Sequence, residues 1–220
     1  MSDKGEPVRW ITVKGKHLPI YEDGSIGVGQ EDAPDRLTTQ SEIEDMIMGL
    51  SDDDFRKQTR VRGARYFGQD FGRELNAFLA SGDMEYLYER PDFKRVIERL
   101  DNAMVEIPKP ITAERYVSEH TFPGFDAKHP EQMVGRTINT PGYLSTTIDA
   151  ENSKFEFSNY PAKVIITAPK GSKAILGAND KEAEVLFYRN SKYDIISYKI
   201  SKNQYGQKQI IYKARLRKGN

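Results

Sequence analysis

The chain of 220 residues balances 33 Lys and Arg against 33 Asp and Glu, and this net charge of zero gives no indication of nucleic-acid binding through bulk charge. Cysteine is absent, which excludes disulfides, thiolate catalysis and cysteine-ligated zinc or iron–sulfur centres. The three histidines, His17, His120 and His129, lack the usual metal-ligand spacings, so we expect no metal site. The length fits one large domain or two small ones.

The beginning of the chain carries no targeting signal that we recognise. Its first ten residues, MSDKGEPVRW, contain neither an apolar stretch nor a cleavage site, so they do not predict a secretory signal. No segment approaches the roughly 20 apolar residues of a membrane-spanning helix. With a mean hydropathy of -0.69, we expect an intracellular protein or one that is delivered by another route.

Residues 1–36 are expected to form an arm. They are rich in Gly, Asp, Pro and Glu, and RWITVKGKHLPI alternates apolar and polar residues around Gly15 and Lys16. This alternation predicts a short β-hairpin. Because a hairpin of this size buries little surface alone, we expect it to dock onto the rest of the protein.

Residues 37–106 carry helical signals. The segment TTQSEIEDMIMGL has Thr and Ser cap candidates followed by Glu, and SDDDF begins with a Ser cap and acidic residues that suit the helix dipole. Farther along, apolar residues recur every three or four positions, and we expect these stripes to pack in the core. One of the nearby glycines is expected to break the helical run. The two stripes are Phe67, Phe71, Leu75, Phe78 and Leu79, and, after Pro91, Phe93, Ile97, Leu100 and Met104.

After Pro108 and Pro110 the pattern changes to short segments of β-branched and aromatic residues separated by turn residues. Seven strand candidates that follow a run of helices predict an α+β fold rather than alternating βαβ units. We interpret the basic run KARLRKG near the end of the last candidate as a solvated tail. The candidates are ITAERYVSE, PGYLSTTID, AKVIITAPK, KAILG, EAEVLFYR, YDIISYKISK and QKQIIYKARLRK.

The triplet Glu182-Ala183-Glu184 opens one of these strand candidates. Side chains alternate along a strand, so both glutamates are expected on one face, where like charges repel unless they have a use. The triplet Glu42-Ile43-Glu44 has the same Glu-x-Glu pattern but lies in a predicted helix, where its two glutamates point in different directions. The second triplet therefore matters only if other functional residues converge on it.

Three strand-like segments do converge in order: AERYV with Arg115, GYLSTTID with Ser145, and GANDKEAEVLF with the two glutamates. This series resembles the Arg–Ser–Glu class of mono-ADP-ribosyltransferases, which includes the clostridial actin-modifying toxins and the vertebrate arginine-directed enzymes. The resemblance covers about residues 93–215, and Thr147 replaces the commoner serine at the third position of the middle motif. It implies an ADP-ribosyltransferase domain over 37–220, with a helical part (37–106) and a mixed or antiparallel β-sandwich core (107–220).

The resemblance also implies a reaction. Members cleave the bond between nicotinamide and ribose in NAD, which serves as co-substrate without a metal. Glu184 would stabilise the cationic sugar and bind the ribose 2′-hydroxyl. Glu182 would hold the attacking group, because glutamate at that position accompanies arginine acceptors in the family, and a carboxylate can bind a guanidinium through two hydrogen bonds. NAD glycohydrolase activity is expected as a side reaction.

The remaining roles also follow from the resemblance. Arg115 would bind a phosphate of NAD, and Ser145 would position Glu184. The cofactor-binding set implied by the resemblance is Arg115, Tyr116, Ser145, Thr146, Phe155 and Glu184. Plainer alternatives stay open at this stage. Arg115 could pair with Glu114 or Glu119, and Ser145 could be an ordinary strand hydroxyl. Phe157 and Tyr160 are candidates beside Phe155 to pack on nicotinamide, and each of the three could instead be a core residue.

The arm adds a second resemblance. RWITVKGKHLPI, followed by GSIGVG, is similar to the Trp-Ile-Thr-x-x-Gly-x-His segment of tailed-phage minor head proteins, some of which carry ADP-ribosyltransferase domains. It implies phage head partners, and action in the cytoplasm of a bacterial host or in association with a virion. Two alternatives to protein-arginine modification remain: a virion structural protein with a relic fold, and modification of a nucleic acid or small molecule. The predicted substrate loop GANDK has no aromatic residue, so the sequence does not predict the target.

Overall fold

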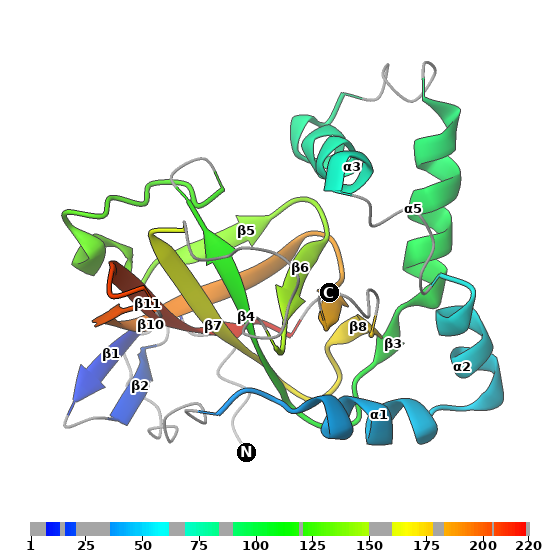
Figure 1. Ribbon diagram of the computed structural model, residues 1–220, viewed down its shortest axis with the longest axis horizontal. Coiled ribbons are helices and arrows are strands. Elements are labelled where there is room, and N and C mark those ends of the chain that lie inside the picture. Colours follow the sequence, from blue (N-terminus) through cyan, green and yellow to red (C-terminus); the bar gives the residue numbers. More distant parts are fainter. Residues whose placement is uncertain are drawn as a thin grey trace.

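The computed structural model describes residues 8–13, 16–20, 36–61, 69–83, 90–118, 121–149, 160–177, 183–203 and 205–218. Among these residues a small hairpin comes first, four described helices follow, and a large mixed sheet ends the chain, so the predicted α+β class is confirmed (Figure 1). Within the described residues, no helix combines the length and the apolar character needed to cross a membrane.

The predicted hairpin is confirmed. Strands β1 (Arg9–Val13) and β2 (Lys16–Ile20) pair antiparallel, with Trp10 opposite Pro19. The hairpin lies against β10, and the guanidinium of Arg215 stands over the Trp10 ring at 5.5 Å. Trp10 retains only 9% of its exposure. The described hairpin is therefore docked onto the sheet.

Local sequence explains where the first helices begin. Helix α1 starts after Thr39, whose side chain accepts from the Glu42 amide while the Glu42 carboxylate accepts from the Thr39 amide. Helix α2 starts after Ser51, which caps the Asp54 amide in the same way. Both caps match the predictions from the sequence. The described helices are α1 (Gln40–Met48), α2 (Asp52–Thr59), α3 (Gln69–Ser81) and α5 (Pro91–Ala103).

The helical region from 51 to 83 contains two described helices, and the first ends before the glycines of this region. Helix α2 ends at Thr59 and α3 begins at Gln69, while Gly72 is accommodated inside α3. Gly63, Gly68 and Phe67 lie outside the described residues. On α5, Phe93 and Leu100 are buried as predicted, but the stripe is completed by Val96 and Ala103, whereas Ile97 and Met104 are only partly buried.

The sheet has nine described strands in the order β3-β8-β9-β6-β4-β7-β11-β10-β5. Neighbours pair antiparallel except for β7 and β11, which run parallel. All seven strand candidates from the sequence are confirmed. The strands are β3 (Val105–Glu106), β4 (Ile111–Val117), β5 (Thr137–Thr140), β6 (Leu144–Thr147), β7 (Ala162–Ala168), β8 (Lys173–Leu176), β9 (Glu184–Phe187), β10 (Ser191–Lys202) and β11 (Lys208–Leu216), and the short 3-10 helix η2 spans Pro130–Met133.

The interpretation of KARLRKG as a solvated tail is wrong for its described part. Residues up to Leu216 belong to β11, an interior strand between β7 and β10. Beyond the strand, Arg217 donates two hydrogen bonds to the buried carboxylate of Asp194 through Nε, at 3.2 and 3.0 Å. The basic side chains are therefore used in strand packing and in an ion pair.

Two apolar clusters fill the fold. The larger joins α1 to the strands of the sheet, through residues such as Ile43, Val164 and Phe187. The smaller packs α3 and α5 on one face of β8 and β9, through Leu75, Leu100, Ile175 and Leu186. Buried Gln58 on α2 adds a polar link, because its amide donates to Ala103 and Ala174 and accepts from Leu176.

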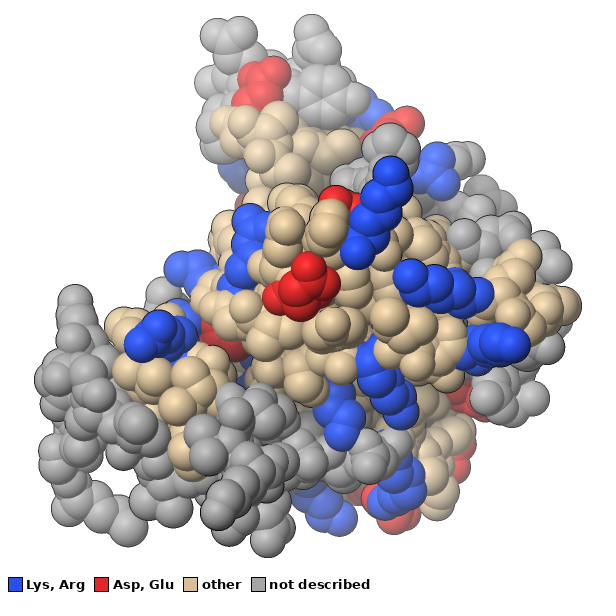
Figure 2. Space-filling view, turned by 90° about the vertical axis from the view of Figure 1, so that its left-hand side faces the viewer, with Lys and Arg blue, Asp and Glu red and all other residues tan. Residues whose placement is uncertain are grey.

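Charged side chains are scattered over the face of the molecule that Figure 2 shows. Lys and Arg side chains there are spread among uncharged residues and a few carboxylates instead of forming one continuous basic surface. Because nucleic-acid binding needs a contiguous basic patch or stripe, this face gives it no support.

Candidate active site

Ser145 and Glu184 come together on adjacent strands. In the β6–β9 register, Ser145 lies opposite Leu186 and Thr147 lies opposite Glu184, so all four side chains are on one face of the sheet. Ser145 Oγ donates to Glu184 Oε1 at 2.5 Å, a short hydrogen bond to a carboxylate. The expected hydrogen bond between Ser145 and Glu184 is therefore present.

Glu184 is almost fully buried, with 4% of its surface exposed. It occupies the first position of β9, a strand whose four residues are all buried. Just before it, Ala183 has φ 45°, a left-handed conformation that is uncommon for a residue with a side chain. The Ile148 amide donates to the Ala183 carbonyl at 3.2 Å and holds this turn. Strained backbone of this kind is often found next to functional groups.

Arg115 reaches the same strand from β4. Its Nη1 donates to the Ser145 carbonyl at 3.3 Å, so the three motif residues are connected directly. The alternative pairing of Arg115 with Glu114 does not occur. Adjacent residues of a strand face opposite sides, and Glu114 instead pairs with Lys163 at 2.7 Å. Glu119 lies outside the described residues.

Glu114 is a second buried carboxylate near the site, with 3% of its surface exposed. It lies opposite Thr147, and Thr147 lies opposite Glu184, so the three residues form one row across β4, β6 and β9. Lys163 Nζ and the Tyr116 hydroxyl both donate to Glu114. Sequence reasoning considered Glu114 only as a partner of Arg115. The sequence does carry a signal for this pair, because Glu114 in AERYV and Lys163 in AKVII are oppositely charged residues within strand-like segments.

The other residues predicted to bind the cofactor or to act in catalysis do not all lie on the face of the sheet that carries Ser145 and Glu184. Tyr116 shares the face of Glu114, and its ring stands 6.1 Å from that of Tyr160 in an edge-on arrangement. Thr146 faces away from Ser145, is buried, and donates to the Val185 carbonyl at 2.7 Å. The hydroxyl of Thr146 thus donates inside the sheet. Glu182, Phe155 and Phe157 lie outside the described residues.

Residues from the helices hold the segment that leads into β6, and sequence reasoning missed them. Asn76 on α3 accepts from the Tyr143 amide at 2.9 Å and donates to its carbonyl at 3.4 Å. The Tyr143 hydroxyl donates to Asp101 on α5 at 2.7 Å, and Asp101 also pairs with Arg189 at 2.9 Å. Burial raises the pKa of Tyr143, and the hydrogen bond to Asp101 raises it further. This phenol is therefore a permanent donor that fixes the start of the Ser145 strand.

Gly142 shows how close α3 comes to this segment. A Cβ at position 142 would collide with the Asn76 side chain, so a residue without a side chain is required where the helix contacts the loop. Helix α3 thus approaches the backbone three residues before Ser145. No sequence pattern links Asn76 to Tyr143, because they are 67 positions apart.

A buried carboxylate that is oriented by serine, with arginine on a further strand, is the arrangement expected of an enzyme that stabilises a cationic sugar centre. The chain belongs to the ADP-ribosyltransferase exoenzyme family, whose family model matches residues 60–218. This match confirms the ADP-ribosyltransferase part of the resemblance drawn from the motifs. A comparison with curated protein sequences gave no match.

Solved structures of similar fold include bacterial toxins. Plx2a, an ADP-ribosyltransferase toxin from Paenibacillus larvae, is 21% identical with a TM-score of 0.57, over 81% of this chain and 92% of that one. C3stau2 from S. aureus, solved with NAD, is 19% identical with a TM-score of 0.60, over 84% and 98%. BECa from a binary enterotoxin of C. perfringens, solved with NADH, is 18% identical with a TM-score of 0.61, over 94% of this chain but 54% of that one.

Proposed function

We propose that the protein transfers ADP-ribose from NAD to an arginine side chain of a target protein and releases nicotinamide. The observation that carries this proposal is the chain of contacts from Arg115 to the Ser145 carbonyl and from the Ser145 hydroxyl to buried Glu184. The solved structure of C3stau2 with NAD supports NAD as the donor, because the same fold holds it there.

The proposed chemistry begins with cleavage of the C–N bond between the ribose and nicotinamide. The bonding electrons leave with nicotinamide, and positive charge develops on the ribose. The Glu184 carboxylate stabilises that charge, and its burial makes the attraction stronger than it would be in water. Ser145 fixes the carboxylate orientation before the reaction, so no reorganisation is needed as the charge develops.

In the second half of the reaction, a guanidinium nitrogen of the target attacks the ribose carbon and loses a proton. We propose that Glu182 holds this guanidinium and accepts the proton. Arg115 contacts a phosphate of NAD through donors that remain besides the one bonded to Ser145. Tyr116, on the face of β4 that carries Glu114, is proposed to contact another part of NAD. Phe155 is proposed to pack on nicotinamide.

The direct test uses NAD that carries a label in its adenosine, incubated with the protein and a bacterial lysate. We expect labelled proteins, release of free nicotinamide, and a modified arginine identified by mass spectrometry. Label on another residue type would contradict the arginine assignment, and label on nucleic acid or a small molecule would favour that alternative. No nicotinamide release from NAD in any mixture would favour a virion structural protein with a relic fold.

Glu182→Gln should separate the two activities. Glutamine keeps the shape but cannot accept the proton of the guanidinium, so transfer to arginine should fall by about 10² to 10⁴-fold. Hydrolysis of NAD by water should remain within about threefold of the wild type, because Glu184 and Ser145 are unchanged. Both rates are measured on one preparation, by label transfer and by nicotinamide release. Equal loss of both would show that Glu182 does not act on the acceptor side.

We also propose that residues 1–36 form an arm that is separate from a catalytic domain spanning 37–220. Deleting the arm should leave NAD hydrolysis intact, because the hairpin lies against β10, whereas Arg115, Ser145 and Glu184 lie on β4, β6 and β9. Loss of the buried Trp10 should cost about 2 kcal/mol and lower the melting temperature by roughly 4–8 °C. The two measurements are nicotinamide release and thermal unfolding. Loss of hydrolysis in a folded protein would make the arm part of the catalytic unit.

Phage head proteins are proposed partners of this arm, and the cytoplasm of a bacterial host is the proposed place of action. The support is the sequence of the arm itself. Affinity purification with the full chain and with the chain lacking 1–36 would test the partner. Recovery of head proteins by both forms, or by neither, would contradict a role of the arm.

A further inference from the structure

The two strands of the candidate catalytic pair, β6 and β9, have neighbouring ends. They pair antiparallel with Leu144 opposite Phe187, so the residue before β6 and the turn after β9 lie at the same end of the pair. The Asn190 amide in that turn donates to the Pro141 carbonyl at 3.2 Å, which joins the two segments directly. Both strands can therefore be held from one place.

One carboxylate on α5 binds both of these ends. Asp101 Oδ1 accepts from the Tyr143 hydroxyl at 2.7 Å, and Tyr143 directly precedes β6. Asp101 Oδ2 accepts from Arg189 Nε at 3.0 Å and from its Nη2 at 2.9 Å, and Arg189 follows β9 by two residues. Hydrogen bonds to an ionised group are roughly twice as strong as neutral ones. We call Asp101, Tyr143 and Arg189 the clamp, because together they connect the start of β6 to the end of β9.

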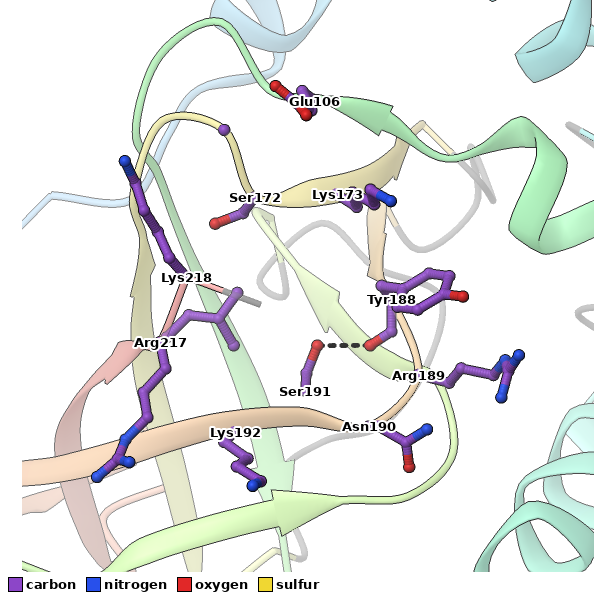
Figure 3. A pocket seen from close by; sticks show the side chains of 12 residues that line it. Glu106, Ser172, Lys173, Tyr188, Arg189, Asn190, Ser191, Lys192, Arg217 and Lys218 are labelled. Carbon is purple, nitrogen blue, oxygen red and sulfur yellow. Dashed lines mark hydrogen bonds between the residues drawn. The ribbon is translucent and has the colours of Figure 1, made fainter. Parts of the chain in front are cut away.

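Figure 3 shows the turn from which Arg189 extends. Arg189 lies between Tyr188 and Asn190, and its side chain is directed away from the hollow that the labelled residues surround. The Ser191 hydroxyl donates to the Tyr188 carbonyl at 2.5 Å and closes the turn. Asn190 has φ 59°, a left-handed conformation that Asn adopts more readily than most residues. Because the turn is closed in this way, Arg189 connects Asp101 firmly to β9.

Helix α3 holds the residue before β6 as well. Asn76 accepts from the Tyr143 amide at 2.9 Å and donates to the Tyr143 carbonyl at 3.4 Å, so both backbone groups of Tyr143 are bound. The Tyr143 side chain is buried in the smaller apolar cluster, between the helices and the sheet. With its backbone bound to α3 and its hydroxyl bound to α5, Tyr143 has little freedom to shift.

The hydrogen bond between Ser145 and Glu184 depends on how β6 and β9 are placed. Ser145 lies directly opposite Leu186, so its hydroxyl reaches Glu184 diagonally, and the bond is 2.5 Å long. Tyr143 lies two residues before Ser145, which is about 7 Å along the strand. A shift of the clamp therefore passes to Ser145 through a short segment. A displacement of about 1 Å in a catalytic geometry can cost about 100-fold in rate.

We propose that Asp101 is a positioning residue for the reaction. By holding Tyr143 and Arg189, it sets the relative placement of β6 and β9. That placement keeps Ser145 within hydrogen-bond distance of Glu184. This inference rests on the proposed function, since the hydrogen bond affects a rate only if Glu184 stabilises the ribose cation. It gives α3 and α5 a part in the reaction besides completing the core.

The test is a double-mutant cycle in the full chain, followed by nicotinamide release over a range of NAD concentrations. Asparagine offers one acceptor oxygen instead of the two of a carboxylate, so Asp101→Asn cannot hold Tyr143 and Arg189 together. We expect kcat to fall by about tenfold, with KM for NAD within about threefold of the wild type because Arg115 is unchanged. In a Ser145→Ala background the same substitution should lower kcat by less than about twofold, since the hydrogen bond that Asp101 positions is already absent.

Two further variants separate positioning from folding. Tyr143→Phe removes only the hydroxyl and should lower kcat by about threefold, again only where Ser145 is present. Asp194→Asn is the matched control, because Asp194 also pairs with an arginine, Arg217, but lies on β10 opposite β5. It should leave kcat within about twofold of its background, with and without Ser145. Thermal unfolding of every variant shows whether it is folded at the assay temperature.

The inference and the proposed function fail in different ways. With an active wild type, equal loss in the presence and absence of Ser145 would make Asp101 a structural residue only and overturn the inference alone. Full activity of folded Asp101→Asn, or a change confined to KM, would do the same. If Asp101→Asn does not fold, Tyr143→Phe decides, and full activity or equal loss in both backgrounds counts against the inference. A wild type that releases no nicotinamide would overturn the proposed function and, with it, the role of Asp101 in the reaction.

Discussion

Glu184→Gln is expected to lower nicotinamide release from NAD by about 10² to 10³-fold or more, and transfer should fall with it. Glutamine can still accept the Ser145 hydrogen bond, which is 2.5 Å long in the native protein, so the local geometry should survive. What disappears is the negative charge that stabilises the cationic ribose. The measurement is the rate of nicotinamide release at saturating NAD, with the binding of NAD checked separately.

The control for this experiment is Glu44→Gln. Glu44 belongs to the other Glu-x-Glu triplet, lies exposed on α1, and accepts one hydrogen bond from Gln40. It should leave both activities within about twofold of the wild type. Unchanged activity in Glu184→Gln, with a folded protein, would remove the carboxylate from the mechanism and leave Glu182 or Glu114 as the acidic group to examine.

Asp194→Ala is expected to destabilise the protein by about 3 kcal/mol, the low end of the range for removing one partner of a buried ion pair. Asp194 is 5% exposed and accepts from Thr137 at 2.6 Å and from Arg217 at 3.0 Å. Its loss would leave Arg217 without its buried carboxylate partner where β5, β10 and β11 meet. The low end applies because the Arg217 side chain keeps 24% of its exposure.

For a chain of this length, that loss corresponds to a melting temperature lower by roughly 6–12 °C. Thermal unfolding followed by circular dichroism measures it. Asp45→Ala is the matched control, because Asp45 is exposed on α1 and should change stability by less than about 0.5 kcal/mol. A shift in Asp194→Ala no larger than in the control would show that the ion pair contributes nothing to stability.

Alternation and composition were enough to predict the interior strands and the capped helices. The two strands that were missed, β3 and β5, are the edges of the described sheet. Edge strands are short and polar because they face solvent, and Thr137–Thr140 buries only Ile138. A pattern search that depends on apolar residues therefore finds interior strands and overlooks edges.

In the candidate site, too, the sequence predicted some residues and missed others. Arg115, Ser145 and Glu184 could be named from motifs because each lies on a strand whose position in the series was visible. The supports could not be named, since Asn76, Tyr143 and Asp101 meet only through folding, across 67 and 42 positions.

The position of β11 has a consequence for how the protein is made. It comes last among the described strands, yet it pairs with β7 on one side and β10 on the other. A growing chain that has not yet added residues 208–216 leaves β7 and β10 as open edges, which invite association with other chains. Pairing between distant segments is also slow to form. An interrupted chain is therefore expected to aggregate rather than to act as a weaker enzyme, so a producing cell would be exposed to activity only after synthesis of the sheet is finished.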